Sequence, residues 1–441
     1  MTTTKNNEHK KLNFSSEREQ NQACLNSAEH EKNQGRKVLN VPNKREQNQT
    51  CLDSAEHEGL RPKGNVPNLR FPEFQGEWEK CKFRDVCSIS TGNKNTQDKI
   101  DDGIYPFYVR SQTVERINSW TFDGEAILTA GDGVGVGKVF HHTYGKIGVH
   151  QRVYILSDFK CDANYLFHFF SSKFYNRVKR MSAKNSVDSV RKEMITDMPL
   201  SLPSHQEQVK IGYLLSLLDE RIATQNKIID KLQSLIKGLN DSLYAQYGDK
   251  VLTSFAELGT SYSGLSGKSA QDFGSGKPFI TYLNVYSNNV INENDFQYVA
   301  IKNGEKQNIV EYGDVLFTLS SETPEEVGIG SVYLGKEKVY LNSFCFGIHI
   351  TNMEVAFPPY LSYYVSSTAF RKFIYPYAQG STRFNLCKAD FEKASIKLPT
   401  LENQKRIYSI LSHIDSKIET EIQMLNLYNS QKQYLLRQMF I

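Results

Sequence analysis

The 441-residue chain lacks several features that would assign it to a common class of protein. No run of about 18 apolar residues is present, which excludes a membrane-spanning helix. The first residues have no apolar core of a secretory signal, so we expect a cytoplasmic protein. Seven cysteines without a Cys-x-x-Cys pair indicate neither a disulfide framework nor a zinc site. The net charge is only +4, so bulk electrostatics alone cannot hold a polyanion, although residues 68–203 carry a small basic excess.

Residues 1–67 contain almost no large apolar side chains, and they include a direct repeat. The segment Arg18–Glu31 (REQNQACLNSAEHE) recurs almost unchanged as Arg45–Glu58 (REQNQTCLDSAEHE). Two such polar copies cannot bury a core, so a solenoid is excluded. The cysteine and histidine of each copy could form a metal cluster, but the composition favours a disordered tail that carries the same residues twice.

The rest of the chain is a long duplication. The segment Leu202–Ile222 (LPSHQEQVKIGYLLSLLDERI) aligns without a gap with Leu398–Ile418 (LPTLENQKRIYSILSHIDSKI). Upstream, Gly124–Thr129 (GEAILT) resembles Gly313–Thr318 (GDVLFT), with a smaller offset, as loop insertions in the second copy would produce. The duplication predicts two related units, residues 68–246 and 250–441.

Each unit begins with a globular portion, residues 68–203 in the first and 250–399 in the second. Short runs rich in β-branched and aromatic residues, separated by Gly, Asn and Asp, come first in each portion and helical patterns come late. Strands followed by helices are typical of α+β domains rather than of alternating parallel folds. We therefore expect two tandem, mixed and strand-rich α+β domains.

Each unit ends in a long helix, residues 204–246 and 400–441. Apolar side chains repeat there at alternating spacings of four and three, which is the pattern of a coiled coil. The predicted seam comprises Ile211, Leu215, Leu218, Ile222, Gln225, Ile229, Leu232, Ile236 and Leu239 in the first helix, and Ile407, Leu411, Ile414, Ile418, Glu421, Leu425 and Tyr428 in the second.

An antiparallel pairing of the two helices is the simplest arrangement, since the second globular portion lies between them in sequence. Gln225 and Glu421 occupy equivalent polar positions, so either they meet and hydrogen-bond, fixing the register, or each reaches solvent. A seam of about 33 residues spans roughly 50 Å, and a turn of B-DNA is about 34–36 Å. Two different heads on such a spacer could read two short sequences at a fixed separation.

Catalytic motifs are missing. The segment Gly131–Val139 (GDGVGVGKV) lacks the glycine spacing and the Ser or Thr of a phosphate-binding loop, so we interpret it as a turn. Phe357–Tyr360 (FPPY) lacks the polar first residue that an amino-methyltransferase needs, and it is typical of a helix start. His141 and His142 have no ligand spacing around them, so no metal site is expected. We expect a non-catalytic chain.

In its two-copy layout, its two Leu-Pro…Gln helices and the segment Gly380–Pro399 (GSTRFNLCKADFEKASIKLP), the chain resembles the DNA specificity subunit of type I restriction–modification enzymes over about residues 68–441. The resemblance implies two target recognition domains, an asymmetric bipartite target on double-stranded DNA, and helices that bind two modification subunits. It also implies that partner subunits carry the chemistry: S-adenosylmethionine for adenine methylation, and ATP with Mg²⁺ for the motor and nuclease. The alternative is a coiled-coil protein–protein adaptor with two duplicated heads and no DNA specificity.

DNA contacts are expected from Arg, Lys, Asn, Gln and Ser side chains in or beside turns, and phosphate contacts should outnumber base contacts. The candidates are Lys94, Arg110, Gln112, Lys138, Arg152, Lys184 and Arg191 in the first unit, and Ser266, Lys268, Asn284, Lys306, Arg383 and Lys388 in the second. The bases that are read do not follow from the sequence.

Overall fold

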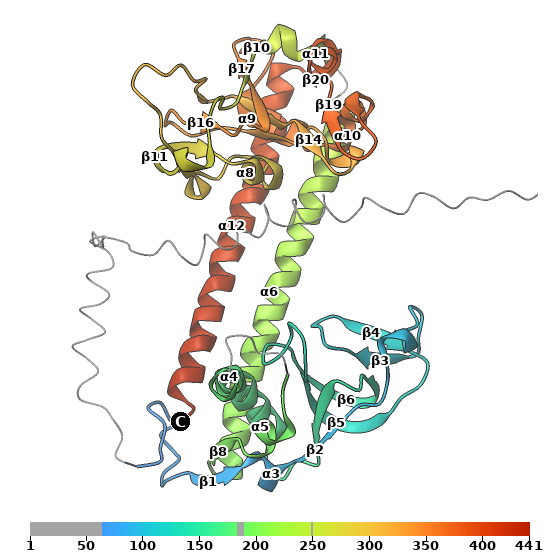
Figure 1. The fold of residues 1–441 in the computed structure, drawn as a ribbon, viewed down its shortest axis with the longest axis vertical. Helices are drawn as coiled ribbons and strands as arrows, with labels where there is room; N and C mark the ends of the chain where they lie inside the picture. The colour runs from blue at the N-terminus through green and yellow to red at the C-terminus, as the bar shows by residue number, and fades with distance from the viewer. Residues whose placement is uncertain (1–63, 183–188, 248–249) are drawn as a thin grey trace, which may run out of the picture. The chain divides into compact units, whose positions relative to one another are not determined.

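The structure is a computed structural model that describes residues 64–182, 189–247 and 250–441 (Figure 1). The repeated segment of the N-terminal tail and Lys184 lie outside the described residues. The described residues before Trp78 belong to one compact unit, and Trp78–Ile441 form a second. Within the described part of the first unit, Arg70 donates hydrogen bonds to the carbonyl oxygens of Gly76 and Gln75, at 2.6 and 3.1 Å.

The first globular domain (residues 78–203) is a strand-rich sheet followed by helices. Its strands are β1 (Glu79–Lys82), β2 (Ser88–Thr91), β3 (Tyr105–Tyr108), β4 (Val114–Ile117), β5 (Phe122–Ala130), β6 (Phe140–Val149), β7 (Val153–Ser157) and β8 (Pro199–Leu202), and its helices are α3 (Phe83–Val86), η1 (Thr96–Asp98), α4 (Ala163–Met181) and α5 (Lys192–Thr196). Six strands form one sheet in the order β2-β7-β5-β6-β3-β4, while β1 pairs with β8. Leu128, Ile147 and Val149 form its core, because alternate residues of paired strands face the same side.

The second globular domain (residues 250–399) repeats this plan with more irregular loops. Its strands are β9 (Lys250–Thr253), β10 (Gly259–Ser263), β11 (Phe273–Ile280), β12 (Gln297–Val299), β13 (Val315–Thr318), β14 (Ser320–Ser321), β15 (Gly330–Val332), β16 (Tyr340–Leu341), β17 (Cys345–Ile350), β18 (Ala378–Gln379), β19 (Phe384–Leu386) and β20 (Ile396–Pro399). Its helices are α7 (Phe255–Leu258), η2 (Ala270–Asp272), α8 (Tyr282–Ser287), η3 (Glu293–Asp295), η4 (Pro324–Glu326), α9 (Pro358–Tyr364), α10 (Thr368–Ile374), η5 (Tyr375–Tyr377) and α11 (Lys388–Lys393).

The two domains share most of their sheet topology, although the second also has a three-stranded sheet, β14-β19-β18, that has no counterpart in the first. The order β10-β17-β13-β15 matches β2-β7-β5-β6, and the antiparallel pair β9 with β20 matches β1 with β8. Each domain also contains one parallel pair, β3 with β6 in the six-stranded sheet of the first and β11 with β16 in a separate three-stranded sheet of the second. The described residues therefore contain two tandem domains of mixed helix and strand content, as the sequence duplication predicts.

Two long helices, α6 (His205–Gln246) and α12 (Leu401–Gln438), follow the two domains. At their N-termini, the glutamine of the Leu-Pro…Gln motif makes the same two kinds of hydrogen bond in both helices. The side chain of Gln208 donates to the carbonyl of Pro203 at 2.8 Å and accepts from the backbone of Asp162 at 3.0 Å. Gln404 repeats both bonds with Pro399 and Phe357, each at 2.8 Å. A buried glutamine thus ties each long helix to the segment that precedes α4 or α9.

The two long helices run in opposite directions. Asp219 pairs with Lys432, Arg221 donates to the Tyr428 hydroxyl at 3.3 Å, and Gln225 donates to the Glu421 carboxylate. Residue numbers rise along α6 in these contacts as they fall along α12. The predicted bond between Gln225 and Glu421 is therefore present, and the amide of Gln225 also donates to the Glu421 carbonyl oxygen at 3.1 Å.

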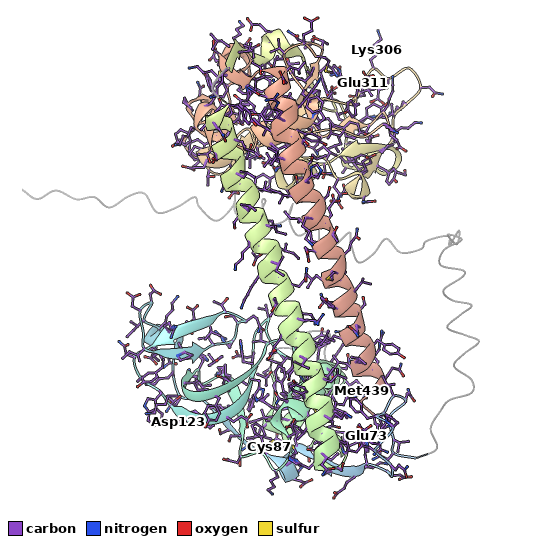
Figure 2. The ribbon with its side chains drawn as sticks, turned by 180° about the vertical axis from the view of Figure 1, so that it is seen from behind. Glu73, Cys87, Asp123, Lys306, Glu311 and Met439 are labelled. Carbon is purple, nitrogen blue, oxygen red and sulfur yellow. The ribbon has the colours of Figure 1, made fainter. Side chains whose placement is uncertain are left out.

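The C-terminal end of α6 packs against the second globular domain, and the C-terminal end of α12 packs against the first (Figure 1). Leu243 of α6 lies in the core of the second domain together with Ile407 and Leu411 of α12. Phe440, just beyond α12, packs edge-on against Tyr165 and Phe169 of α4, and Figure 2 marks the neighbouring Met439 at this end of the helix. Every predicted seam residue is buried or half-buried, and none is exposed.

Candidate functional site

Two arginines predicted to contact DNA converge on one carboxylate in the first domain. Arg110 follows β3, Asp132 follows β5, and Arg152 precedes β7. Because β5 and β7 are antiparallel neighbours, the end of one lies beside the start of the other. The guanidinium of Arg110 lies 2.8 Å from one Asp132 oxygen, and that of Arg152 lies 3.7 Å from the other. Both side chains remain largely exposed, so the carboxylate orients two cations toward solvent.

Lys94 lies next to this pair of arginines. Its backbone bridges to His150, and its carbonyl accepts from the backbone of Gln151 at 2.8 Å. His150 is buried, and its Nδ1 accepts from the backbone of Arg152 at 3.0 Å, which requires an unprotonated nitrogen. The pKa of His150 is lowered first by burial and then by Arg110. Arg152 lowers this pKa further, whereas Asp132 and Asp98 act in the opposite direction.

The remaining described candidates of the first domain surround the glycine-rich loop Gly131–Val139. Lys138 lies over the ring of Tyr175, 5.5 Å from its centroid, and the Gln112 amide is 3.5 Å from the carbonyl oxygen of Phe140. Arg191 precedes α5, and the adjacent Val190 donates from its backbone to Gly131 at 2.7 Å. Five predicted residues that lie far apart in sequence are thus gathered at or beside one loop: Arg110, Gln112, Lys138, Arg152 and Arg191.

In the second domain the structure corrects two of the predicted residues. Lys268, with a side chain only 6% exposed, donates to Glu305 and to the carbonyl of Ala300, both at 2.7 Å. It lowers the pKa of Glu305 to about 2. Asn284 is 3% exposed and donates to the carbonyl of Asn292 at 2.8 Å. Both side chains hold loops together, and we leave them out of the candidate interface.

The other second-domain candidates lie in two places. Ser266 and Lys306 are exposed near Gln307, whose side chain bonds the backbone of Ser266 in both directions, at 3.1 and 2.8 Å. Figure 2 shows Lys306 projecting from this domain. Arg383 is exposed in the turn between β18 and β19. Lys388, at the start of α11, lies 5.1 Å from the ring centroid of Phe346 and 3.6 Å from Glu392.

The loop that corresponds to Gly131–Val139 has a different character in the second domain. It runs between β14 and β15 and carries Glu322, Glu325 and Glu326. Glu326 accepts from the Tyr286 hydroxyl at 2.8 Å and from Ser321 at 3.0 Å, and its pKa is lowered first by the Tyr286 bond. Glu322 and Glu325 are exposed. The two domains therefore present unlike chemistry on equivalent loops.

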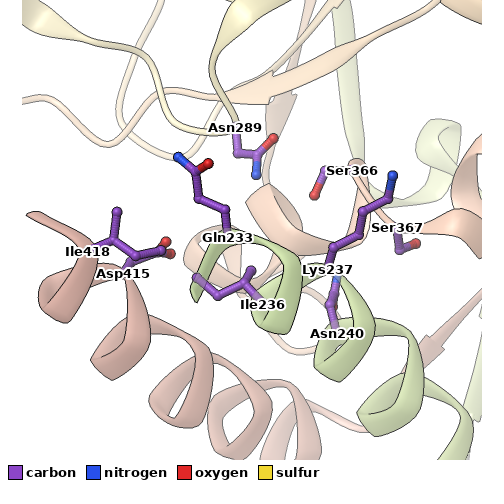
Figure 3. Close-up of a pocket in the computed structure, with 9 residues that line it drawn as sticks. All are labelled: Gln233, Ile236, Lys237, Asn240, Asn289, Ser366, Ser367, Asp415 and Ile418. Atoms are coloured by element: carbon purple, nitrogen blue, oxygen red, sulfur yellow. The ribbon is translucent and has the colours of Figure 1, made fainter. Parts of the chain in front are cut away.

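A separate pocket of about 400 Å³ lies where both long helices meet the second domain (Figure 3). Gln233 and Lys237 of α6, Asp415 of α12, and Asn289 and Ser366 of the second domain line it. Asp415 accepts from the Tyr363 hydroxyl, and burial raises the pKa of Asp415. The residues predicted to contact DNA do not line this pocket.

The sequence did not single out Asp132, His150 or the tip of the glycine-rich loop, because their roles depend on strands that are distant in sequence. Among the described residues, no group of three or more His, Cys, Asp or Glu side chains could hold a metal ion. The described helices include none that is both long and apolar enough to span a bilayer.

Comparison with known proteins supplies two kinds of likeness. A family model described as "Type I restriction modification DNA specificity domain" matches residues 75–234 and again 257–427. The type I restriction enzyme EcoDI specificity subunit of Escherichia coli is 26% identical over 161 residues, which are 36% of this chain and 35% of that subunit. The MjaVIII specificity subunit of Methanocaldococcus jannaschii is 25% identical over 384 residues, 80% of this chain and 88% of the relative.

Solved structures agree in fold. The S subunit of a type I restriction–modification system from M. genitalium matches with a TM-score of 0.54 and 14% identity, over 85% of this chain and 99% of that one. A chain from a study of complex assembly in a type I system matches with a TM-score of 0.51, also at 14% identity, over 83% of this chain and 98% of that one. The match to the E. coli relative spans only about a third of its length.

Proposed function

Because the chain belongs to the type I restriction modification DNA specificity family, which matches it twice, we propose that it is the non-catalytic subunit that reads a bipartite, asymmetric DNA target. Each globular domain reads one half of the target. The observation that carries this proposal is that two domains of the same topology present different side chains on equivalent loops. A scaffold that only joined proteins would gain nothing from this divergence.

The first domain supports this role through its charges. Two guanidinium groups held by one carboxylate are preorganised, so less side-chain entropy is lost when they meet a phosphate or a guanine edge. Lys138 and Arg191 extend the same basic surface around the loop. In the second domain, Lys306 and Arg383 are the exposed cations we propose for the same purpose.

We propose that α6 and α12 pack as an antiparallel coiled coil and hold the two readers at a fixed separation. The alternating apolar positions, the Gln225–Glu421 bond and the contact of Asp219 with Lys432 support one register. Outside the seam, both helices carry more exposed apolar side chains than a helix that faces only solvent needs. We propose that they dock two modification subunits; they include Tyr213, Leu217, Leu235, Ile410, Leu427 and Tyr434.

We propose that partner subunits supply the chemistry that this chain lacks. The modification subunits would hold S-adenosylmethionine and methylate adenine, and the motor and nuclease subunits would use ATP and Mg²⁺. This assignment rests on the family resemblance, and the complex would act in the cytoplasm.

A domain exchange tests the proposed function. Residues 68–203 are replaced by the corresponding segment of another family member, and the methylated sites are mapped by sequencing in a host that carries the modification subunit. One half of the target should change and the other half should stay, because each domain reads independently. The reciprocal exchange of residues 250–399 is the control and should change the opposite half. If both halves or neither change, the proposal is wrong, and no sequence-dependent binding at all would favour the adaptor alternative.

A further inference from the structure

The tip of the glycine-rich loop in the first domain carries an apolar side chain that the fold does not use. Val134 is 98% exposed, whereas Val136, two residues on, is 3% exposed and anchors the loop. Glycines flank Val134 on both sides. Gly133 has a φ of +74° and Gly137 one of +64°, which L residues rarely adopt. The sequence thus places one valine inward and one outward on a tight turn.

The loop is fixed rather than merely exposed. The backbone of Val136 donates to Gly133 at 3.1 Å, and those of Lys138 and Val139 donate to Gly135 at 3.0 and 2.9 Å. A side chain at Gly135 would approach the carbonyl oxygen of Arg110 to 2.4 Å, so only glycine lets the loop lie against the arginine. Val134 is therefore presented on a turn whose base is built into the sheet.

The surroundings of Val134 are cationic. Arg110 and Arg152 converge on Asp132, two residues before Val134, and Lys138 lies four residues after it. A surface of this charge attracts the phosphates of a nucleic acid. An apolar tip projecting from that surface would meet the floor of a groove rather than the phosphates on its rim.

We propose that Val134 contacts the C5-methyl group of a thymine in the major groove of the half-site that the first domain reads. This inference rests on the proposed DNA-reading function. A valine can neither donate nor accept a hydrogen bond, and the thymine methyl is the apolar feature that the major groove displays. Guanidinium groups beside it match guanine edges in the same groove. Proteins that bind the minor groove instead insert larger apolar side chains, such as Phe, Leu or Met, between base steps.

The inference applies to one half-site only. The corresponding loop of the second domain presents Glu322 and Glu325, whose carboxylates can accept from a cytosine amino group but offer no apolar tip. The contrast explains how equivalent loops on one scaffold can select different bases.

The test removes single methyl groups from the DNA. The full chain in complex with its modification subunits is bound to its mapped target, and each thymine of the relevant half-site is replaced in turn by deoxyuridine. At one thymine the loss of the methyl group should weaken binding about fourfold, the value of one buried methyl. Val134→Ala should weaken binding to the unmodified target by a similar factor and should abolish the effect of deoxyuridine at that position.

Controls separate this inference from other causes. Val290→Ala alters an exposed valine of the second domain and should leave the deoxyuridine effect intact. The melting temperature of Val134→Ala should match that of the unmodified chain, since the side chain packs against nothing. A half-site without a methyl-sensitive thymine would overturn the inference. Unchanged sensitivity to deoxyuridine in Val134→Ala would also overturn it. If Val134→Ala instead reduced DNA bending and no thymine were methyl-sensitive, Val134 would act as a wedge and the inference would be wrong. Specific binding to a bipartite target would in each case leave the proposed function standing.

Discussion

His168 illustrates how a single buried side chain makes the junction between α4 and the long helices sensitive to pH. Its Nε2 lies 3.3 Å from the Ser216 hydroxyl, and its Nδ1 lies 3.7 Å from one Asp219 oxygen, while the other Asp219 oxygen pairs with Lys432. The pKa of His168 is lowered to about 3, first by burial, then by Lys432 and by His142. The imidazole is therefore neutral in the folded chain at pH 7.

Acidification should destabilise the chain through His168. The folded-state pKa lies below the unfolded value of about 6.5, so the unfolded state binds the proton first as the pH falls, and stability is lost from about pH 6.5 downward. Between pH 7 and pH 5 this group should cost about 2 kcal/mol. Urea denaturation at both pH values should give a smaller decline for His168→Gln, whereas His413→Gln, an exposed histidine of α12, should behave as the unmodified chain. Equal declines in all three would contradict the assignment.

At the scale of the residue, sequence patterns separated the exposed from the buried only in part. Arg110 and Lys268 look alike in the sequence, as cations beside turns. In the structure, Arg110 pairs with Asp132 and stays exposed, whereas Lys268 is buried against Glu305. The difference depends on which loops lie opposite, and no local pattern contains that information.

Among the elements, the end of α12 is fixed by one aromatic side chain. Phe440 is 4% exposed, with ring centroids 5.3 and 5.6 Å from those of Tyr165 and Phe169 on α4. This contact joins the last residues of the chain to its first globular domain.

Removal of this contact should loosen the attachment of α12 to the first domain. Phe440→Ala should lower the free energy of unfolding by roughly 3 kcal/mol, since it deletes a buried ring and leaves a cavity. Protease resistance of the C-terminal turns should fall with it. Tyr434→Ala, which removes a 53% exposed aromatic of the same helix, is the matched control and should change stability by no more than about 0.5 kcal/mol. Equal losses in the two variants would show that Phe440 does not anchor the helix.

For the whole molecule, the helix pair should set the spacer between the two half-sites. Inserting one heptad into both helices, after Gln225 and before Glu421, keeps the seam in phase, preserves the Gln225–Glu421 bond and lengthens the pair by about 10 Å. The mapped target should then gain about three base pairs between its halves, given a rise of about 3.4 Å per pair. A heptad inserted into α6 alone should instead misalign the contacts of Asp219 and Arg221 with α12 and reduce methylation. An unchanged spacer in the double insertion would contradict a ruler.

The sequence by itself determined the large-scale plan of this protein. Local patterns and self-similarity show the duplicated Leu-Pro…Gln segments, the strand-then-helix order and the family resemblance. Two matches to one family model confirm the resemblance. The contact of Gln225 with Glu421 could be predicted because the two positions are equivalent in the duplication.

Tertiary structure alone decided which side chains form the candidate surface. Arg110, Asp132 and Arg152 come from three strand ends that only the order β7-β5-β6-β3 brings together. The sequence predicted only a turn at the glycines of this loop, and the structure shows that Val134 points outward and Val136 inward. Periodicity describes what one element does along its own axis, whereas a recognition surface is made where several elements end, and its chemistry is fixed by the packing between them.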